Sequence, residues 1–365
     1  MAQNSASTAE ACFDFGPRML QFSALLKSSI ELRRAVIISR TPVRVSFCGG
    51  GTDLDSFAKT EDLGGMVISA AISKHIYVTV NNRFDRRIRL SYSKMETVNG
   101  VGEIEHDLIR EAMRATGVSD GVEITTIADI PSRGTGLGSS SAVTVGVLNA
   151  LHSLVGEDVD ARKLASEACE IEIEKLGEPI GRQDQYAAAF GGLNRITFDK
   201  NGVKVCPIPL SKSTLERIES EFSLVYTDTT RSASAVLSEP PSNFEDKLKR
   251  LRIIRDQATE AERIIRSGEM EALGRLLGDA WGVKRGLSPS VSNDGLDSLY
   301  ARLLDLGANG GKLLGAGGGG FFLIHGDSDL RSRLVDELPT RNKVIPFRVD
   351  FDGSRIIHPM KGSIP

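Results

Sequence analysis

The chain has 365 residues and a formal net charge of −3, from 45 Lys and Arg against 48 Asp and Glu. Its hydrophobic share of 40% is typical of a soluble globular protein, and its length suffices for two domains. A near-neutral chain without blocks of Lys and Arg argues against nucleic acid or a membrane surface as partner, because both require a basic face. A charged ligand must therefore be held by local groups.

The four cysteines, Cys12, Cys48, Cys169 and Cys206, are far apart and form no metal-binding spacing with the five histidines. This usage indicates a reducing compartment, so we expect a cytoplasmic protein. No stretch reaches the roughly 18–20 apolar residues of a membrane helix. Residues 1–35 lack the basic start and apolar centre of a secretory signal, and we expect a partly disordered N-terminal extension.

Apolar and polar residues alternate from residue 36 onward, which predicts strands of one mixed sheet. We expect these strands at 36–38, 43–47, 76–80, 88–92, 122–127, 193–198 and 203–207. Helical spacing of apolar residues predicts helices at 106–116, 142–154, 160–175 and 181–190, the third of them capped by Asp160. We place a domain boundary at residue 208, which gives domains 36–208 and 209–365.

The second domain is predicted to begin with a strand and to continue with three helices. A glycine-rich turn at 315–320 then precedes the last two strands. The predicted strands are 223–227, 321–325 and 346–351, and the predicted helices are 243–266, 270–284 and 293–306.

The most informative segment is 131–142, PSRGTGLGSSSA, which follows a strand and opens a helix. Glycines let the backbone approach a ligand closely, and a helix N-terminus presents free N–H groups to an anion. The serine hydroxyls can bind a phosphate or Mg²⁺. A Ser-capped helix after a flexible loop is the alternative.

Two common phosphate loops do not fit the sequence. No GxxxxGK[ST] run exists, because Leu313 follows Gly311-Lys312. The glycines at 134, 136 and 138 do not have the GxGxxG spacing of a dinucleotide-binding loop. The loop is therefore of another kind.

Segment 131–142 resembles the second motif of the GHMP kinases, the superfamily of galactokinase, homoserine kinase, mevalonate kinase and phosphomevalonate kinase. Residues 40–53 and 312–321 resemble the first and third motifs, and the resemblance covers about residues 36–352. It implies an α+β, two-domain fold. The N-terminal domain would be a mixed sheet with helices and a left-handed crossover at the phosphate loop, and the C-terminal domain a ferredoxin-like α/β sandwich.

Within the superfamily, the GGGTD ending of the first motif and the run 181–192 resemble the D-glycero-D-manno-heptose 7-phosphate kinase branch. Residues 227–234 and 281–288 resemble branch segments that line the sugar-phosphate side. Fucokinase-like and galactokinase-like relatives share much of this frame.

The resemblance implies two catalytic residues. Asp184 matches the aspartate beside the acceptor hydroxyl, where a carboxylate can accept the proton. Arg44 matches the basic residue near this aspartate and the transferring phosphate. A helix cap or an ion pair is the structural alternative for Asp184.

For the metal, the resemblance implies Mg²⁺ held by Glu172 with the hydroxyl of Ser140, or less readily that of Ser139. Glu170 and Glu174 are the alternatives to Glu172. A merely solvated acidic helix face would also explain these glutamates.

The resemblance also implies binding residues for ATP and for the sugar. Asp53 would accept hydrogen bonds from sugar hydroxyls, with a capped turn as its alternative. The cationic side chains of Arg231, Lys284 and Arg285 would bind the phosphate of the acceptor. The expected ATP-phosphate residues are Gly134, Gly136, Leu137, Gly138, Ser139, Ser140 and Ser141, and the expected substrate residues are Gly50, Gly51, Thr52, Asp53, Gly318, Arg231, Lys284 and Arg285.

We therefore expect an ATP- and Mg²⁺-dependent kinase that phosphorylates the anomeric hydroxyl of D-glycero-D-manno-heptose 7-phosphate. The product would be the 1,7-bisphosphate, a precursor of nucleotide-activated heptose for surface polysaccharide. The alternatives are a kinase for another sugar, such as L-fucose or galactose, and a non-catalytic sensor of ATP and sugar. A homodimer is a possible assembly.

Overall fold

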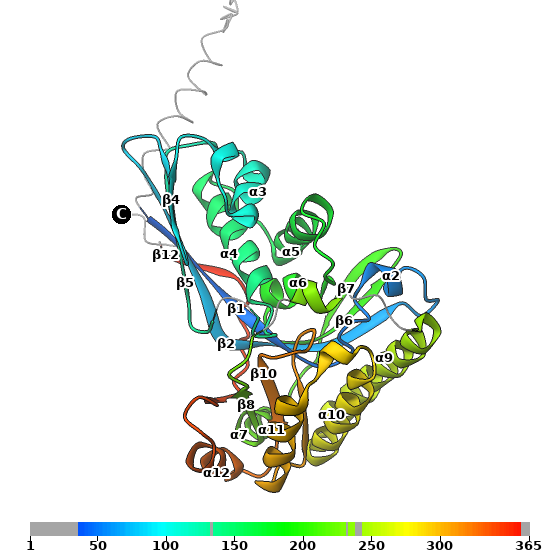
Figure 1. Ribbon diagram of the computed structural model, residues 1–365. Helices are drawn as coiled ribbons and strands as arrows, with labels where there is room; N and C mark the ends of the chain where they lie inside the picture. The colour runs from blue at the N-terminus through cyan, green and yellow to red at the C-terminus, as the bar shows by residue number, and fades with distance from the viewer. Residues whose placement is uncertain (1–35, 132–133, 231–232, 238–242, 359–365) are drawn as a thin grey trace, which may run out of the picture. The chain divides into compact units, whose positions relative to one another are not determined.

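The computed structural model describes residues 36–131, 134–230, 233–237 and 243–358 (Figure 1). The larger of two β-sheets has the strand order β12-β1-β2-β5-β3-β4, with β6 paired to β2 and β7 paired to β6. The smaller sheet has the order β11-β8-β10-β9. The strands are β1 Val36–Cys48, β2 Gly65–Asn82, β3 Ile88–Ser91, β4 Met95–Val98, β5 Val122–Ala128, β6 Leu193–Asp199, β7 Gly202–Pro207, β8 Phe222–Tyr226, β9 Gly310–Leu313, β10 Phe321–His325, β11 Val344–Pro346 and β12 Arg355–His358.

Helices cover these sheets, and among the described residues no helix is both long and apolar enough to cross a bilayer. A six-residue π-helix, Glu170–Lys175, continues directly from α5. The α-helices are α2 Asp55–Ala58, α3 Asp107–Thr116, α4 Ser139–Leu154, α5 Ala161–Cys169, α6 Gln183–Phe190, α7 Lys212–Glu221, α8 Ala233–Leu237, α9 Phe244–Ser267, α10 Met270–Arg285, α11 Asp294–Asp305 and α12 Leu330–Glu337.

Strand β1 changes its environment along its length. Its first residues alternate between buried and partly exposed, and from Thr41 to Cys48 every residue is buried. Because neighbouring side chains of a strand point to opposite faces, this second half must be covered on both faces. Helices α4, α6, α9 and α10 all pack against β1. The buried half of β1 carries Arg44 and leads into the glycines of the first motif.

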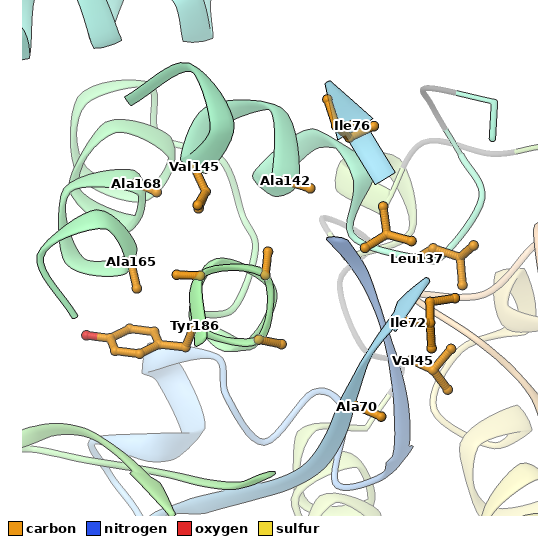
Figure 2. Close-up of a cluster of buried hydrophobic side chains, with 14 of the residues drawn as sticks. Val45, Ala70, Ile72, Ile76, Leu137, Ala142, Val145, Ala165, Ala168 and Tyr186 are labelled. Atoms are coloured by element: carbon orange, nitrogen blue, oxygen red, sulfur yellow. The ribbon is translucent and has the colours of Figure 1, made fainter. Parts of the chain in front are cut away.

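The core above β1 and β2 is formed by α4, α5 and α6 (Figure 2). Val145 of α4, Ala165 and Ala168 of α5 and Tyr186 of α6 are buried in one apolar cluster with Ile72 of β2. Alanines at these positions let the three helices approach closely. The packing therefore fixes the N-termini of α4 and α6, which carry the second motif and Asp184.

Most predicted elements are present with small shifts of their ends, but the predicted strand 76–80 is only part of β2, which begins at Gly65. The predicted strands 36–38 and 43–47 are one strand, β1, with a bulge where Pro42 lacks an N–H group. Asp160 caps α5 by accepting a hydrogen bond from the backbone of Lys163, as predicted. The predicted helix 160–175 ends as a π-helix. The sequence analysis missed α2, α7, α8, α12, β4, β9 and β12.

The predicted strand 346–351 is wrong. The strand is Val344–Pro346, which pairs with β8 in the smaller sheet. The chain then crosses toward the larger sheet, where Val349 forms an isolated bridge with Ile72. Because this segment passes between two sheets, its apolar residues pack without a continuous ladder, and Phe347 lies buried against Phe47 and Phe222. The domain boundary at residue 208 stays a prediction.

The loops of the second and third motifs touch through glycine backbone. A methyl group on Gly315 would lie 2.4 Å from Gly136 Cα, and one on Gly136 would lie 2.6 Å from the Leu314 carbonyl oxygen. Both glycines have positive φ angles, +68° and +74°. Only residues without a side chain allow these two loops to meet.

We expect Gly315→Ala to lower the free energy of unfolding by two separate effects. The left-handed backbone costs about 1–2 kcal/mol, and the forced separation of the loops costs about 1–3 kcal/mol more. Gly117→Ala is the matched control, because Gly117 has φ +72° and open space around its missing Cβ. Chemical denaturation measures both variants, and equal losses would contradict the loop contact.

Candidate functional site

The three motif segments and residues 172–184 surround one cavity of about 780 Å³. This volume is typical of a pocket for small ligands. The sequence-predicted residues that line it are Arg44, Gly50, Gly51, Asp53, Gly134, Gly136, Gly138, Ser139, Ser140, Ser141, Glu172, Asp184 and Lys284. The motifs, which are far apart in the sequence, therefore meet at one place.

Two residues that were predicted to bind ligands do not point their side chains into the cavity. The side chain of Leu137 is buried in the apolar core, so only its backbone belongs to the loop. Thr52 is buried and donates its hydroxyl to the carbonyl oxygens of Gly49 and Met66. Thr52 therefore holds the first-motif loop in place.

Three further residues were predicted to bind the substrate, and the structure places none of them at the cavity. Arg285 is exposed, where it pairs with Asp297 at 3.2 Å and covers the Trp281 ring. The Gly318 backbone donates to the carbonyl oxygen of Val291. Arg231 lies outside the described residues.

The N-terminus of α4 is open toward the cavity. Gly138, with φ +71°, precedes the helix, and no side chain of the described residues caps this end. The first turn contains Ser139, Ser140 and Ser141 and no acidic residue. The N–H groups of a first helical turn and the positive end of the helix dipole make this a place for an anion.

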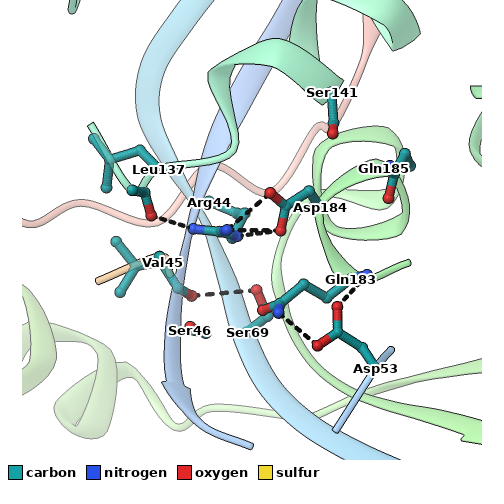
Figure 3. A network of polar contacts seen from close by, with 12 residues as sticks. Arg44, Val45, Ser46, Asp53, Ser69, Leu137, Ser141, Gln183, Asp184 and Gln185 are labelled. Carbon is teal, nitrogen blue, oxygen red and sulfur yellow. Dashed lines mark hydrogen bonds and ion pairs between the residues drawn. The ribbon is translucent and has the colours of Figure 1, made fainter. Parts of the chain in front are cut away.

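Arg44 and Asp184 form a bidentate ion pair (Figure 3). Arg44 Nε lies 2.7 Å from Asp184 Oδ1, and Nη2 lies 2.8 Å from Oδ2. The third guanidinium nitrogen donates to the Gly136 carbonyl oxygen at 2.5 Å. The side chain of Arg44 is 6% exposed and that of Asp184 22%, so the carboxylate is the more accessible partner. The pair fixes the carboxylate beside the loop of residues 134–141, which is predicted to bind phosphate.

Asp53 follows the glycines of the first motif and lies buried next to Gln183, the first residue of α6 (Figure 3). It accepts hydrogen bonds from the backbone of Gly51 at 2.9 Å, the backbone of Gln183 at 3.2 Å and Gln183 Nε2 at 2.9 Å. Burial, followed by the charge of Asp184, raises the pKa of Asp53. A methyl group on Gly181 would collide with its Oδ2, so Gly181 makes room for the carboxylate. The sequence analysis gave no role to Gln183, which only its contact with Asp53 reveals.

Glu172 is the one glutamate of the π-helix, within the described residues, that lines the cavity. Its carboxylate accepts hydrogen bonds from Ser141 at 2.8 Å, from Thr144 at 2.9 Å and from Gln185. Burial raises its pKa to about 7, and the three hydrogen bonds oppose this shift. The serine of this turn whose hydroxyl contacts Glu172 is thus Ser141, while Ser140 is exposed at the cavity wall.

The two alternatives to Glu172 point to solvent. Glu170 is exposed and pairs with Lys175 at 3.1 Å. Glu174 is exposed and pairs with Arg182 at 3.5 Å. Neither carboxylate lines the cavity.

Two lysines reach the cavity from the second half of the chain. Lys284 Nζ donates to the carbonyl oxygens of Leu313 at 2.9 Å and Gly315 at 2.5 Å. Lys312 Nζ donates to the carbonyl oxygens of Ser46 and Phe47, both at 3.0 Å. The sequence analysis noted Lys312 in the third motif without a role, because the burial of a strand lysine depends on tertiary packing.

Comparisons with known proteins show the family to which the chain is similar. The family model "GHMP kinases N terminal domain" matches residues 104–192. D-glycero-alpha-D-manno-heptose 7-phosphate kinase of Campylobacter jejuni is 32% identical over 83% of this chain and 93% of its own length. The bifunctional fucokinase/GDP-fucose pyrophosphorylase of Arabidopsis thaliana is 25% identical over 84% of this chain and 32% of its own length.

A solved structure shares the fold. The crystal structure of a D-glycero-D-manno-heptose 1-phosphate kinase from Bacteriodes thetaiotaomicron has a TM-score of 0.73 and 24% identity, with 88% of this chain and 98% of that chain covered. The predicted α+β kinase fold is therefore confirmed. The chain belongs to the GHMP kinase family and is a sugar kinase, a phosphotransferase with an alcohol group as acceptor.

Proposed function

We propose that this kinase transfers the γ-phosphate of ATP to the anomeric hydroxyl of D-glycero-D-manno-heptose 7-phosphate and forms the 1,7-bisphosphate. The product would serve the synthesis of nucleotide-activated heptose. One observation carries the proposal: Arg44 holds the Asp184 carboxylate at the cavity wall, between the open N-terminus of α4 and Asp53. The heptose is supported by the name of the Campylobacter jejuni relative.

In this reaction the anomeric oxygen attacks the γ-phosphorus, and the bond from phosphorus to the bridging oxygen of ADP breaks. Asp184 accepts the hydroxyl proton or orients the hydroxyl for attack. Arg44 fixes that carboxylate and offsets the negative charge of the transferring group. Asp53 accepts hydrogen bonds from sugar hydroxyls, and the 134–141 loop holds the phosphates of ATP.

The residues at the α4 N-terminus fit a Mg²⁺ ion. Among the described residues no group of three or more His, Cys, Asp or Glu could form a complete metal site. Mg²⁺ in kinases is commonly bound by one or two protein oxygens and by substrate phosphates, so the Glu172 carboxylate and the Ser140 hydroxyl suffice. The bound ion would neutralise charge on the phosphates. Ser141, Thr144 and Gln185 orient Glu172 for that role.

Asp184→Asn is expected to lower kcat by about 100- to 10,000-fold, because the amide cannot accept the proton. Its dissociation constant for ATP should change little. A coupled ADP-release assay and calorimetry with ATP measure the two quantities. Asp305→Asn, at an exposed position of α11, is the control. Full turnover of the Asp184 variant would remove this carboxylate from the mechanism.

Binding of Mg-ATP should weaken as the pH falls below 7. The Glu172 carboxyl, with its pKa near 7, becomes protonated there and can no longer bind the metal. Affinity should fall by up to about tenfold per pH unit below this pKa. Calorimetry at pH 6 and pH 8 measures the effect, which Glu172→Gln should abolish. Glu174→Gln should keep the pH dependence, and an unchanged dependence in Glu172→Gln would contradict the assignment.

A substrate panel tests the acceptor. Turnover with Mg-ATP is expected on D-glycero-D-manno-heptose 7-phosphate and not on the unphosphorylated heptose, L-fucose, D-galactose or mannose 6-phosphate. The Arabidopsis thaliana relative makes L-fucose the second candidate. Turnover on a free sugar alone would reject the heptose phosphate and keep the kinase chemistry. ATP binding without any turnover would support the sensor alternative.

A further inference from the structure

Lys284 of α10 and Lys312 of β9 present two ammonium groups to the same cavity. Each donates to two backbone carbonyl oxygens, as described above. An ammonium group has three N–H donors, so each lysine retains one for a further partner. Within the described residues, neither ammonium forms an ion pair with a carboxylate. In the part of the chain that the structure describes, the two lysines therefore have no carboxylate partner.

The surroundings of both lysines lower their pKa values. Burial lowers the pKa of Lys284 well below its usual value, and the charges of Lys312 and Arg44 lower it further. Burial also lowers the pKa of Lys312, to about 8. The Arg44 charge is offset by Asp184, whereas the hydrogen bonds of the two ammonium groups to described residues go to backbone carbonyl oxygens. Burying such groups unpaired is costly, which favours a missing anion.

The backbone contacts place the lysines between two ligand-binding segments. Lys312 holds the carbonyl oxygens of Ser46 and Phe47, immediately before the glycines of the first motif. Lys284 donates a hydrogen bond to the carbonyl oxygen of Gly315. The backbone of Gly315 packs closely against Gly136 of the predicted phosphate-binding loop. Both lysines thus line the cavity between the first-motif loop and the loop of residues 134–141.

We propose that Lys284 and Lys312 together bind a phosphate dianion in the cavity. The phosphate that the acceptor carries before the reaction is one source, in which case the inference rests on the proposed function. The terminal phosphate of the nucleotide is the other source. Both present the oxygen acceptors that a pair of ammonium groups binds.

Thermal unfolding with inorganic phosphate tests the site without any substrate. Phosphate should raise the melting temperature of the wild-type protein more than chloride does at equal ionic strength. The double variant Lys284→Met with Lys312→Met should show a smaller difference, because only the N-terminus of α4 and the general exclusion of phosphate from protein surfaces then remain. Lys200→Met, at an exposed turn, should keep the wild-type difference. A double variant that responds like the wild type would overturn the proposal, as would a wild type that responds equally to both anions.

If the double variant does not fold, the single variants and the charge-preserving Lys284→Arg and Lys312→Arg decide the question. Each Met variant should bind inorganic phosphate about tenfold or more weakly, and each Arg variant should recover part of the loss. Met and Arg variants that bind phosphate equally would show that charge is irrelevant and would overturn the proposal.

Kinetics of the same variants distinguish the two sources. An increased KM for the sugar phosphate, with unchanged ATP affinity, assigns the site to the acceptor. A lower kcat with weaker ATP binding assigns it to the transferred phosphate. If the substrate panel rejects the heptose phosphate, phosphate binding by the wild type still tests this inference separately. Unchanged kinetic constants in both Met variants would contradict a role in either site.

Discussion

Four nitrogens of Arg44 are hydrogen-bonded, and together they hold the cavity in shape. The guanidinium binds Asp184 of α6 and the carbonyl oxygen of Gly136, and the backbone N–H binds the carbonyl oxygen of Leu137. One residue of β1 therefore joins the first motif, the phosphate-binding loop and the predicted catalytic aspartate. Its strand is buried on both faces, so the guanidinium has little freedom to leave this arrangement.

Acidic side chains dominate one part of the cavity, and lysine side chains dominate the other. Asp53, Glu172 and Asp184 lie at the N-termini of α4 and α6, where backbone and side-chain donors bind them. Lys284 and Lys312 approach from the second half of the chain. This polarity suits the proposed phosphate transfer to a sugar hydroxyl, because cations stabilise the negative charge of the transferred group and a carboxylate can accept the hydroxyl proton.

The sequence predicted much of this site because its motifs combine glycines with polar residues at defined spacing. The resemblance of these motifs to those of the GHMP kinases implied the roles of Asp53, Glu172 and Asp184, and the structure brings all three to the cavity. Lys312 and Gln183 were not found, because their importance depends on burial and on partners distant in the sequence. The incorrect strand at 346–351 has a similar cause: its apolar residues fit a strand, and only the crossing between two sheets prevents the ladder.

The π-helix at Glu170–Lys175 has a consequence for the length of this segment. A π-turn corresponds to one residue inserted into an α-helix, and each residue turns an α-helix by about 100°. A chain shortened by one residue here would return to regular α-helix, and Glu172 would leave its position opposite Ser141 and Thr144. An insertion or deletion of one residue in this π-helix, a change that a surface loop would tolerate, would therefore move the Glu172 carboxylate away from the N-terminus of α4. Every motif residue would still be present in the sequence.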